Sequence, residues 1–157
     1  MNRLSIEKRA QILQLLCEGM SIRATCRATG ASKNTVAKLL ADVGNACLDY
    51  QDEHLVDLAC KRVQCDEIWS FCYAKAKNVP KEMRGEFGVG DVWTWVALDA
   101  DTKLVPCWSV GDRGSDTARD FMLNLAGRVQ GRFQLTTDGH GAYLPAVEAA
   151  FGGEVDY

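Results

Sequence analysis

The first 45 residues contain three short segments in which apolar residues recur at the three- and four-residue spacing of an amphipathic helix. Each segment opens on a serine that can cap a helix and closes at a glycine. The predicted N-caps are Ser5, Ser21 and Ser32, and the predicted stops are Gly19, Gly30 and Gly44. The predicted inward positions are Ile6, Ala10, Leu13, Leu16 and Cys17 in the first segment and Val36, Leu39, Leu40 and Val43 in the third. The pattern predicts three helices within residues 1–45.

The spacing in the second and third segments is typical of a helix-turn-helix. Cys26 is small enough for two helices to cross closely, Gly30 forms the turn, and Val36 holds the third helix in place. Polar side chains near the start of the third helix then face outward, at the end that enters a DNA major groove. The candidate DNA-binding residues are Arg23, Arg27, Lys33, Asn34, Thr35 and Lys38. The alternative is a plain three-helix bundle with a basic surface.

The remaining residues change from helical to alternating patterns. Residues 46–61 predict a connecting helix or linker, which leads into a body at 62–157. The predicted strands span 62–73, 92–98, 104–110, 132–137 and the chain from 154, with one helix capped by Ser115 and another over about 142–150. This mixed α/β order, three antiparallel strands followed by crossover units, is the order of the ribonuclease-H-like fold. The predicted core tryptophans are Trp69, Trp93, Trp95 and Trp108.

Composition adds limits on location and redox chemistry. The chain has 157 residues, of which 47% are hydrophobic and 25% charged, as in globular proteins. No apolar stretch approaches the roughly 18 residues of a membrane span, and the N-terminus lacks the apolar core of a signal peptide. We therefore expect a cytoplasmic protein, nucleoid-associated in a bacterium, with no membrane partner. Seven cysteines without a C-x-x-C pair argue against disulfides and against a four-ligand zinc site.

The charge is unevenly distributed along the chain. A formal net charge of -3 argues against a nucleic-acid partner when taken as an average. Residues 1–45, however, hold seven basic and three acidic side chains, whereas 46–157 hold eleven basic and eighteen acidic ones. This asymmetry predicts a basic binding module joined to an acidic body.

Two acidic residues are the candidate catalytic and metal-binding groups. Asp66 lies in the middle of the first predicted strand, where Asp is rare, and Asp138 follows the fourth. These strands are neighbours in a sheet of this order, and two close carboxylates repel unless a hard divalent cation lies between them. With Mg²⁺ (or Mn²⁺) bound, the site would activate a water or a 3′-hydroxyl for displacement at phosphorus. The alternative for Asp138 alone is a turn former before Gly139, and His140 is either a phosphate contact or a loop residue.

Three stretches resemble one family of proteins. Residues 65–71 (CDEIWSF) and 136–143 (TTDGHGAY) resemble the first and second acidic motifs of DDE transposases of the insertion sequence 1 family. Residues 22–36 are similar to that family's helix-turn-helix. The resemblance covers nearly the whole chain, and the order and separation of the motifs are more specific than any one of them.

The resemblance implies a transposase of a mobile element, which takes part in DNA recombination. Such a protein binds terminal inverted repeats and uses a ribonuclease-H-like domain with a divalent metal to cut and join DNA strands. Asp66 and Asp138 would be its first and second metal-binding acids. Its partners would be double-stranded DNA, at element ends and target, and further copies of the chain in an active homo-oligomer.

The sequence departs from the family pattern in two places. The family's third acid, a Glu, lies on a helix after the fifth strand. The acids that follow Asp138 are Glu148, Glu154 and Asp156, which precede or lie in the expected fifth strand, so none of them occupies that position. We therefore expect a ribonuclease-H-like domain that is incomplete at its C-terminal helix, with impaired strand transfer. The cysteine zinc finger that some members carry ahead of the helix-turn-helix has no counterpart here.

Three other hypotheses remain open. The chain could be a helix-turn-helix regulator without catalysis, which competes with an intact enzyme for the same DNA. It could also be a ribonuclease-H-like nuclease unrelated to transposition, which would cut without end specificity. The third is an unstable fragment, because a frayed terminal strand invites aggregation. DNA binding, metal-dependent cleavage and cooperative unfolding distinguish these hypotheses.

Overall fold

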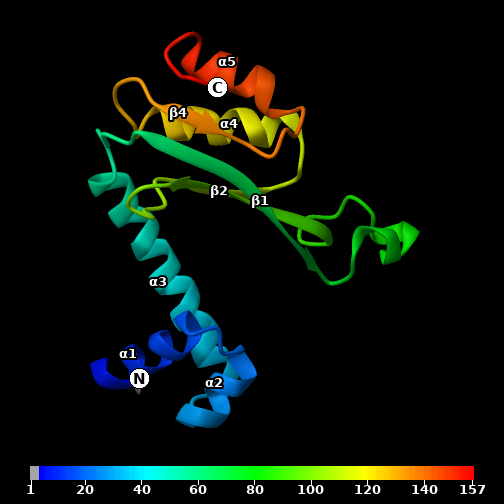
Figure 1. Ribbon diagram of the computed structural model, residues 1–157. Coiled ribbons are helices and arrows are strands. Elements are labelled where there is room, and N and C mark those ends of the chain that lie inside the picture. Colours follow the sequence, from blue (N-terminus) through cyan, green and yellow to red (C-terminus); the bar gives the residue numbers. More distant parts are fainter. Residues whose placement is uncertain (1–3) are drawn as a thin grey trace. The chain divides into compact units, whose positions relative to one another are not determined.

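The structure is a computed structural model that describes residues 4–157. The chain divides into two compact units, Met1–Asp52 and Glu53–Tyr157, whose elements are labelled in Figure 1. Within residues 4–157 no helix is long and apolar enough to cross a membrane.

The first unit is built from three helices, α1 (Ile6–Cys17), α2 (Ile22–Thr29) and α3 (Lys33–His54). The three predicted serine caps are confirmed. Ser5 Oγ accepts a hydrogen bond from the Lys8 N–H at 3.2 Å, and Ser21 and Ser32 do the same for the N–H groups of Ala24 and Thr35. Each cap satisfies one of the orphan N–H groups at a helix start, which is worth about 1 kcal/mol.

The turn between α2 and α3 follows the predicted helix-turn-helix spacing. Gly30 ends α2 with φ +71°, a left-handed conformation that favours glycine, and its N–H donates to the Cys26 carbonyl. Val36 of α3 is fully buried, as are Thr25 of α2 and Ile12 of α1. The local sequence therefore determines both the conformation of the turn and which neighbouring side chains are buried.

Two features of the first unit differ from the prediction. The third helix does not stop at Gly44 but continues to His54, so residues 46–54 belong to α3 and are not a separate connecting helix. Gly44 lacks the left-handed conformation by which Gly30 ends α2, and the helix continues through it. Ile6 and Leu40, both predicted to face inward, are 71% and 44% exposed, because the short helices meet along a face marked by Ile12 and Val36.

The second unit contains a four-stranded mixed sheet in the order β3-β2-β1-β4. The strands are β1 (Arg62–Cys72), β2 (Gly90–Asp99), β3 (Trp108–Gly111) and β4 (Gln134–Thr136). The first three are antiparallel neighbours, whereas β4 lies parallel to β1. Two 3₁₀ turns, η1 (Ala76–Asn78) and η2 (Lys81–Met83), lie in the long β1–β2 connection. The order is that expected of a ribonuclease-H-like sheet.

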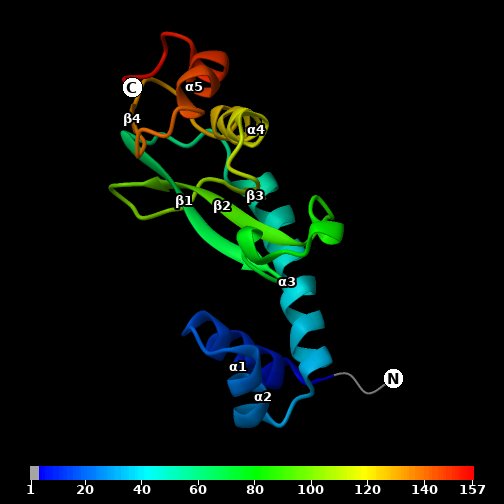
Figure 2. The ribbon, with the colours of Figure 1, turned by 90° about the vertical axis from the view of Figure 1, so that its right-hand side faces the viewer.

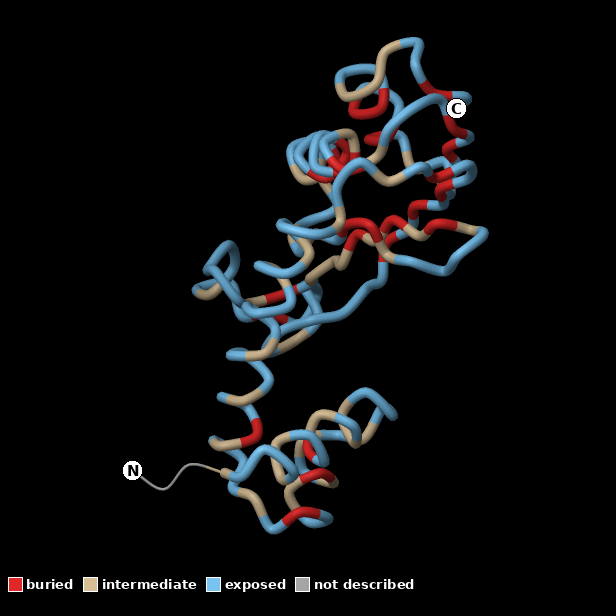
Figure 3. Tube along the Cα trace, turned by 90° about the vertical axis from the view of Figure 1, so that its left-hand side faces the viewer, coloured by how far each residue is buried: buried red, intermediate tan, exposed pale blue. Residues whose placement is uncertain are grey.

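Two helices, α4 (Ser115–Ala126) and α5 (Tyr143–Phe151), pack on one face of this sheet. Figure 2 shows them on the same side of the strands, and Figure 3 shows buried residues gathered between the layers. The fully buried side chains of Trp95, Phe121 and Tyr143 join β2, α4 and α5 into one core. Trp95 packs against the other two rings at centroid distances of 5.9 and 5.2 Å. The core thus holds the sheet and both helices as one body.

Several elements of the second unit begin or end at other residues than predicted. β3 begins at Trp108 and not at Leu104, because Pro106 has no N–H to donate to a strand ladder. α4 is capped by Gly114, with Ser115 as its first residue. The expected fifth strand is present as one parallel bridge, between Gln134 and Asp156.

The tryptophans do not all belong to the core. Trp95 is fully buried and Trp93 packs against the core, as predicted. Trp69 and Trp108 are 39% and 37% exposed, which corrects the prediction that they are core residues. The side chain of Trp69 lies under the ammonium of Lys75, 4.9 Å from the ring centroid.

All seven cysteines are free thiols. Cys17, Cys47 and Cys72 are exposed, whereas Cys60, Cys65 and Cys107 are buried. Burial raises the pKa of the Cys65 thiol and raises that of Cys107 to about 12. The buried thiols are thus poorly ionised as well as inaccessible.

We expect a thiol reagent at pH 8 to label the exposed cysteines in the native protein at least about a hundredfold faster than Cys65 and Cys107, because the thiolate is the reactive form. Mass spectrometry of peptides after short labelling measures the rates. Addition of urea should abolish the difference. Equally fast labelling of Cys65 in the native protein would contradict the described core.

Candidate functional site

Two predicted acids meet because of the parallel pairing of β1 with β4. Val63 lies opposite Leu135 and Gln64 lies opposite Thr136. The same offset, carried two residues further, places Asp138 beside Asp66. The structure thus brings together two residues that are 72 positions apart in the sequence.

A third carboxylate, from Glu67, joins this pair. One carboxylate oxygen each from Asp66, Glu67 and Asp138 lies within 4.8 Å of the other two. Asp66 and Asp138 are exposed residues, whereas the side chain of Glu67 is fully buried on the helix-covered face. The acid cluster, defined by these three residues, therefore lies at the end of β4 and takes carboxylates from both faces of the sheet.

The carboxylate oxygens of the acid cluster are held by backbone groups. Asp66 Oδ1 accepts a hydrogen bond from the N–H of Glu67 at 2.8 Å. Asp138 Oδ1 accepts one from the N–H of His140 at 2.9 Å. Glu67 Oε1 is buried without a hydrogen bond. A buried polar atom without a partner is costly.

One guanidinium bridges two of the three acids. Arg113 Nε donates to Glu67 Oε2 at 2.9 Å, and Arg113 Nη2 donates to Asp138 Oδ2 at 2.9 Å. The hydrogen bond to Glu67, followed by the charges of both carboxylates, raises the pKa of Arg113. The same guanidinium lies over the ring of Trp93, 4.9 Å from its centroid. The Arg113 guanidinium is therefore held both by the two carboxylates and by the Trp93 ring.

The backbone that carries Arg113 is fixed between β3 and α4. Trp95 Nε1 donates to the carbonyl of Asp112 at 3.0 Å, and the His140 ring nitrogen Nε2 lies 3.2 Å from the carbonyl of Arg113. A Cβ added at Gly111 would lie 2.8 Å from the Thr117 side chain, so the chain needs glycine there. Arg113 thus projects from a well-ordered loop.

Tyr143 closes the buried side of the acid cluster. Burial first, and the Glu67 carboxylate second, raise the pKa of Tyr143, so the phenol stays protonated. Its hydroxyl lies near Glu67 without a hydrogen bond of standard geometry. The His140 ring packs against both this residue and Trp95, at centroid distances of 6.2 and 6.0 Å. His140, predicted as a phosphate contact or a loop residue, takes part in this packing.

The acid cluster has the chemistry of a site for a hard divalent cation. All three donors are carboxylate oxygens, which Mg²⁺ and Mn²⁺ prefer over nitrogen or sulfur. Oxygens on opposite sides of Mg²⁺ lie about 4.2 Å apart, so atoms within 4.8 Å of one another need only small side-chain movements. Glu67 Oε1 has no hydrogen-bond partner, whereas Glu67 Oε2 accepts from Arg113, so a cation at the acid cluster would lie close to this guanidinium. The residues therefore fit the cation that the sequence led us to expect.

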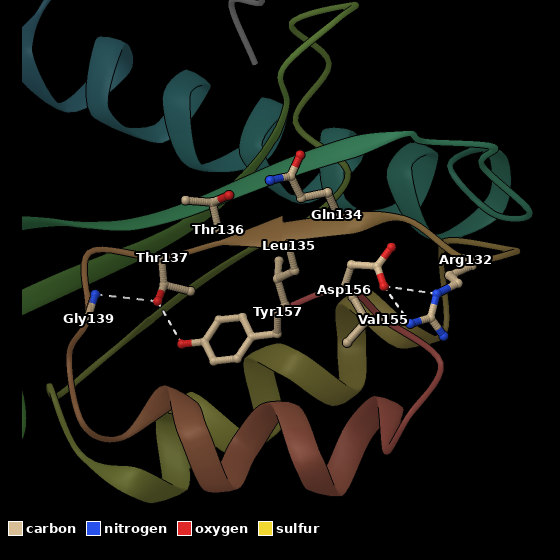
Figure 4. Close-up of a pocket in the computed structure, with 9 residues that line it drawn as sticks. All are labelled: Arg132, Gln134, Leu135, Thr136, Thr137, Gly139, Val155, Asp156 and Tyr157. Atoms are coloured by element: carbon tan, nitrogen blue, oxygen red, sulfur yellow. Dashed lines mark hydrogen bonds and ion pairs between the residues drawn. The ribbon is translucent and has the colours of Figure 1, made fainter.

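Two grooves lie along β4. A groove of about 440 Å³ is lined by Asp66, Asp138 and Ile68, together with residues of β2 and β4. A larger groove of about 860 Å³ follows the other edge of β4 (Figure 4). There Arg132 pairs with Asp156, and the hydroxyls of Thr137 and Tyr157 share a hydrogen bond of 2.8 Å. Since its charges are paired, the larger groove offers no acidic site.

The predicted DNA-binding residues lie on α2 and at the start of α3. Arg23 and Arg27 are exposed on α2, and Lys33 and Asn34 are exposed in the first turn of α3. The remaining two residues have side-chain partners. Thr35 shares a hydroxyl hydrogen bond of 2.8 Å with Ser32, and Lys38 pairs with Asp42 one turn further along the helix.

Sequence reasoning placed Asp66 and Asp138 but not the other members of the site. Glu67, next to Asp66 in the same predicted strand, is not among the candidates predicted from the sequence. An acid in the alternating buried positions of a strand is the signal that points to it. Arg113 has no local signal, since its position depends on the turn between β3 and α4.

Comparisons with known proteins give a local match and a distant one. A family model described as a homeodomain-like domain matches residues 3–43. No curated protein matches the sequence. Among solved structures, the chain is similar to one described as the crystal structure of the Mos1 strand transfer complex, with 14% identity and a TM-score of 0.41. The alignment covers 100% of this chain and 60% of that one, so the chain spans three fifths of the protein it matches.

Proposed function

We propose that this chain is a transposase of the insertion sequence 1 type, which binds double-stranded DNA through its first unit and cuts and joins strands at the acid cluster. The observation that carries the proposal is the convergence of Asp66, Glu67 and Asp138 within 4.8 Å beside an exposed groove. The motif resemblance at residues 65–71 and 136–143 supports the same function.

The DNA-binding part rests on the first unit. Its homeodomain-like match covers all three caps and the left-handed Gly30 turn. Exposed basic residues lie on α2 and at the start of α3, the end that enters a major groove in this motif. Lys33 and Lys38 would contact phosphates, and Asn34 would contact a base edge.

The catalytic part rests on the acid cluster. A bound divalent cation would supply an activated water or 3′-hydroxyl and would stabilise the leaving oxygen at phosphorus. Asp66 and Asp138 would hold the cation at the groove, and buried Glu67 would complete the set from beneath. Backbone N–H groups of Glu67 and His140 orient the two aspartates before a cation binds. These contacts reduce the reorganisation that binding requires.

A second candidate function is a DNA-binding regulator without catalysis. The observation that favours it is the engagement of two of the three acids by Arg113 at 2.9 Å each. In a regulator this ion-pair network would serve stability alone. The two functions share the first unit and differ only in whether a cation binds the second.

The DNA-binding part predicts a selective effect of lysines on α3. Lys33→Ala and Lys38→Ala should each weaken binding to double-stranded DNA several-fold, and should each reduce the slope of log K against log salt by about one. Gel shifts over a range of salt concentrations measure both quantities. Folding should be unaffected, since the exposed Lys38–Asp42 pair is worth only about 0.5 kcal/mol.

Lys61→Ala is the matched control, because it removes the same charge from the second unit. Its affinity and salt slope should equal those of the wild type. Equal losses in all three variants would indicate a nonspecific charge effect. No shift of any DNA at low salt would overturn the DNA-binding part.

The catalytic part predicts that Asp66→Asn and Asp138→Asn abolish Mn²⁺ binding, because each removes a ligand charge. In the wild type, Mn²⁺ at a hundredfold excess over its Kd should stabilise the fold by about 2.7 kcal/mol. Thermal unfolding with and without Mn²⁺ measures the difference. Asp120→Asn, an exposed acid on α4 paired only with Arg119, is the control and should respond like the wild type.

Cleavage of double-stranded DNA separates catalysis from binding. Nicking that requires Mg²⁺ or Mn²⁺ and is lost in Asp66→Asn would support strand cleavage at the acid cluster. Nicking that is equal in the wild type and in Asp66→Asn would assign the activity to another site. Mn²⁺ binding without any nicking would favour the regulator.

A further inference from the structure

We propose that Arg113 is a built-in counter-ion that competes with a divalent cation for Glu67 and Asp138, so that the cation binds only as the guanidinium moves away. The inference rests on the cation site proposed above, and extends it to a residue that is not a ligand. Without a cation, Arg113 positions the carboxylates of Glu67 and Asp138 and is not itself a ligand.

The geometry gives Arg113 two of the oxygens that a cation needs. Its Nε and Nη2 groups each donate to a different carboxylate at 2.9 Å, which joins Glu67 to Asp138. Both oxygens of Asp138 are engaged, one by Arg113 and the other by the N–H of His140. A cation that ligates Asp138 must therefore share an oxygen with one of these donors.

Sharing an oxygen with Arg113 is electrostatically unfavourable. A cation about 2.1 Å from an oxygen that also accepts a bond of 2.9 Å lies within roughly 5 Å of the guanidinium nitrogen. At that separation a doubly and a singly charged cation repel strongly enough to change affinity by about tenfold, even with the dielectric constant of water. The acid cluster thus favours one cation or the other.

The structure also provides room for the displaced side chain. A hollow of about 500 Å³ adjoins the guanidinium and is lined by Trp93, Asp112 and Asp91 among others. Stacking on Trp93 does not depend on the acids, so it can hold the guanidinium during the movement. The backbone of Arg113 need not move, because hydrogen bonds from Trp95 and His140 fix the loop.

Competition predicts that Arg113→Gln binds Mn²⁺ more tightly than the wild type. We expect the Kd for Mn²⁺ to fall about tenfold in the full chain without DNA, measured by electron paramagnetic resonance of free Mn²⁺. Without metal, Arg113→Gln should unfold at a lower temperature than the wild type, and Mn²⁺ should raise its Tm by more. Arg119→Gln, which removes an exposed arginine from α4, should change neither quantity.

Arg113→Lys is a second variant, which tests the competition even if Arg113→Gln fails to fold. Lysine keeps the charge but lacks the fork that bridges two carboxylates, so we expect a Kd between those of the wild type and Arg113→Gln. Mn²⁺ binding in both variants that is equal to or weaker than in the wild type would overturn the competition. If Asp138→Asn still lost Mn²⁺ binding, that result would continue to support the proposed cation site. No Mn²⁺ binding by any variant at millimolar concentration would overturn both proposals.

Discussion

The parallel ladder between β1 and β4 is the constraint on which the acid cluster depends. It is short, with three paired positions from Arg62 to Gln64, but it sets which residues emerge side by side where β4 ends. A register slip of one residue would turn Asp138 toward the other face, away from Asp66. The antiparallel pairing of β1 with β2 over ten positions holds β1 in place on its other side.

Charge balance is the second requirement at this position. Three carboxylates within 4.8 Å carry more negative charge than a partly buried site tolerates without compensation. Arg113 reduces the imbalance, and the N–H groups of Glu67 and His140 add oriented dipoles. These contacts compensate part of the negative charge, although Glu67 Oε1 has no hydrogen-bond partner.

Local chemistry made part of the structure predictable. Serine caps and a left-handed glycine act over three or four residues, so Ser5, Ser21 and Gly30 could be placed from sequence. Asp66 and Asp138 could be paired because strand order alone makes their strands neighbours. These predictions needed no knowledge of tertiary packing.

The remaining features depend on contacts that a sequence does not display. Gly44 is compatible with either a helix end or a helix interior, so the length of α3 could not be predicted from it. The exposure of Trp69 follows from the limited area that α4 and α5 cover. Arg113 reaches the acids only because β3, α4 and His140 fix its loop, and no short motif encodes that arrangement.

The brevity of β4 has a mechanical consequence for the sheet. Beyond Thr136 the ladder has ended, and there the Arg113 side chain joins Glu67 of β1 to Asp138. Whatever bridges these two carboxylates acts as a staple across the sheet and resists the fraying of β4 from β1. By thermodynamic linkage, any ion that bound across these carboxylates would favour the closed sheet edge, and closure of the edge would favour binding of that ion.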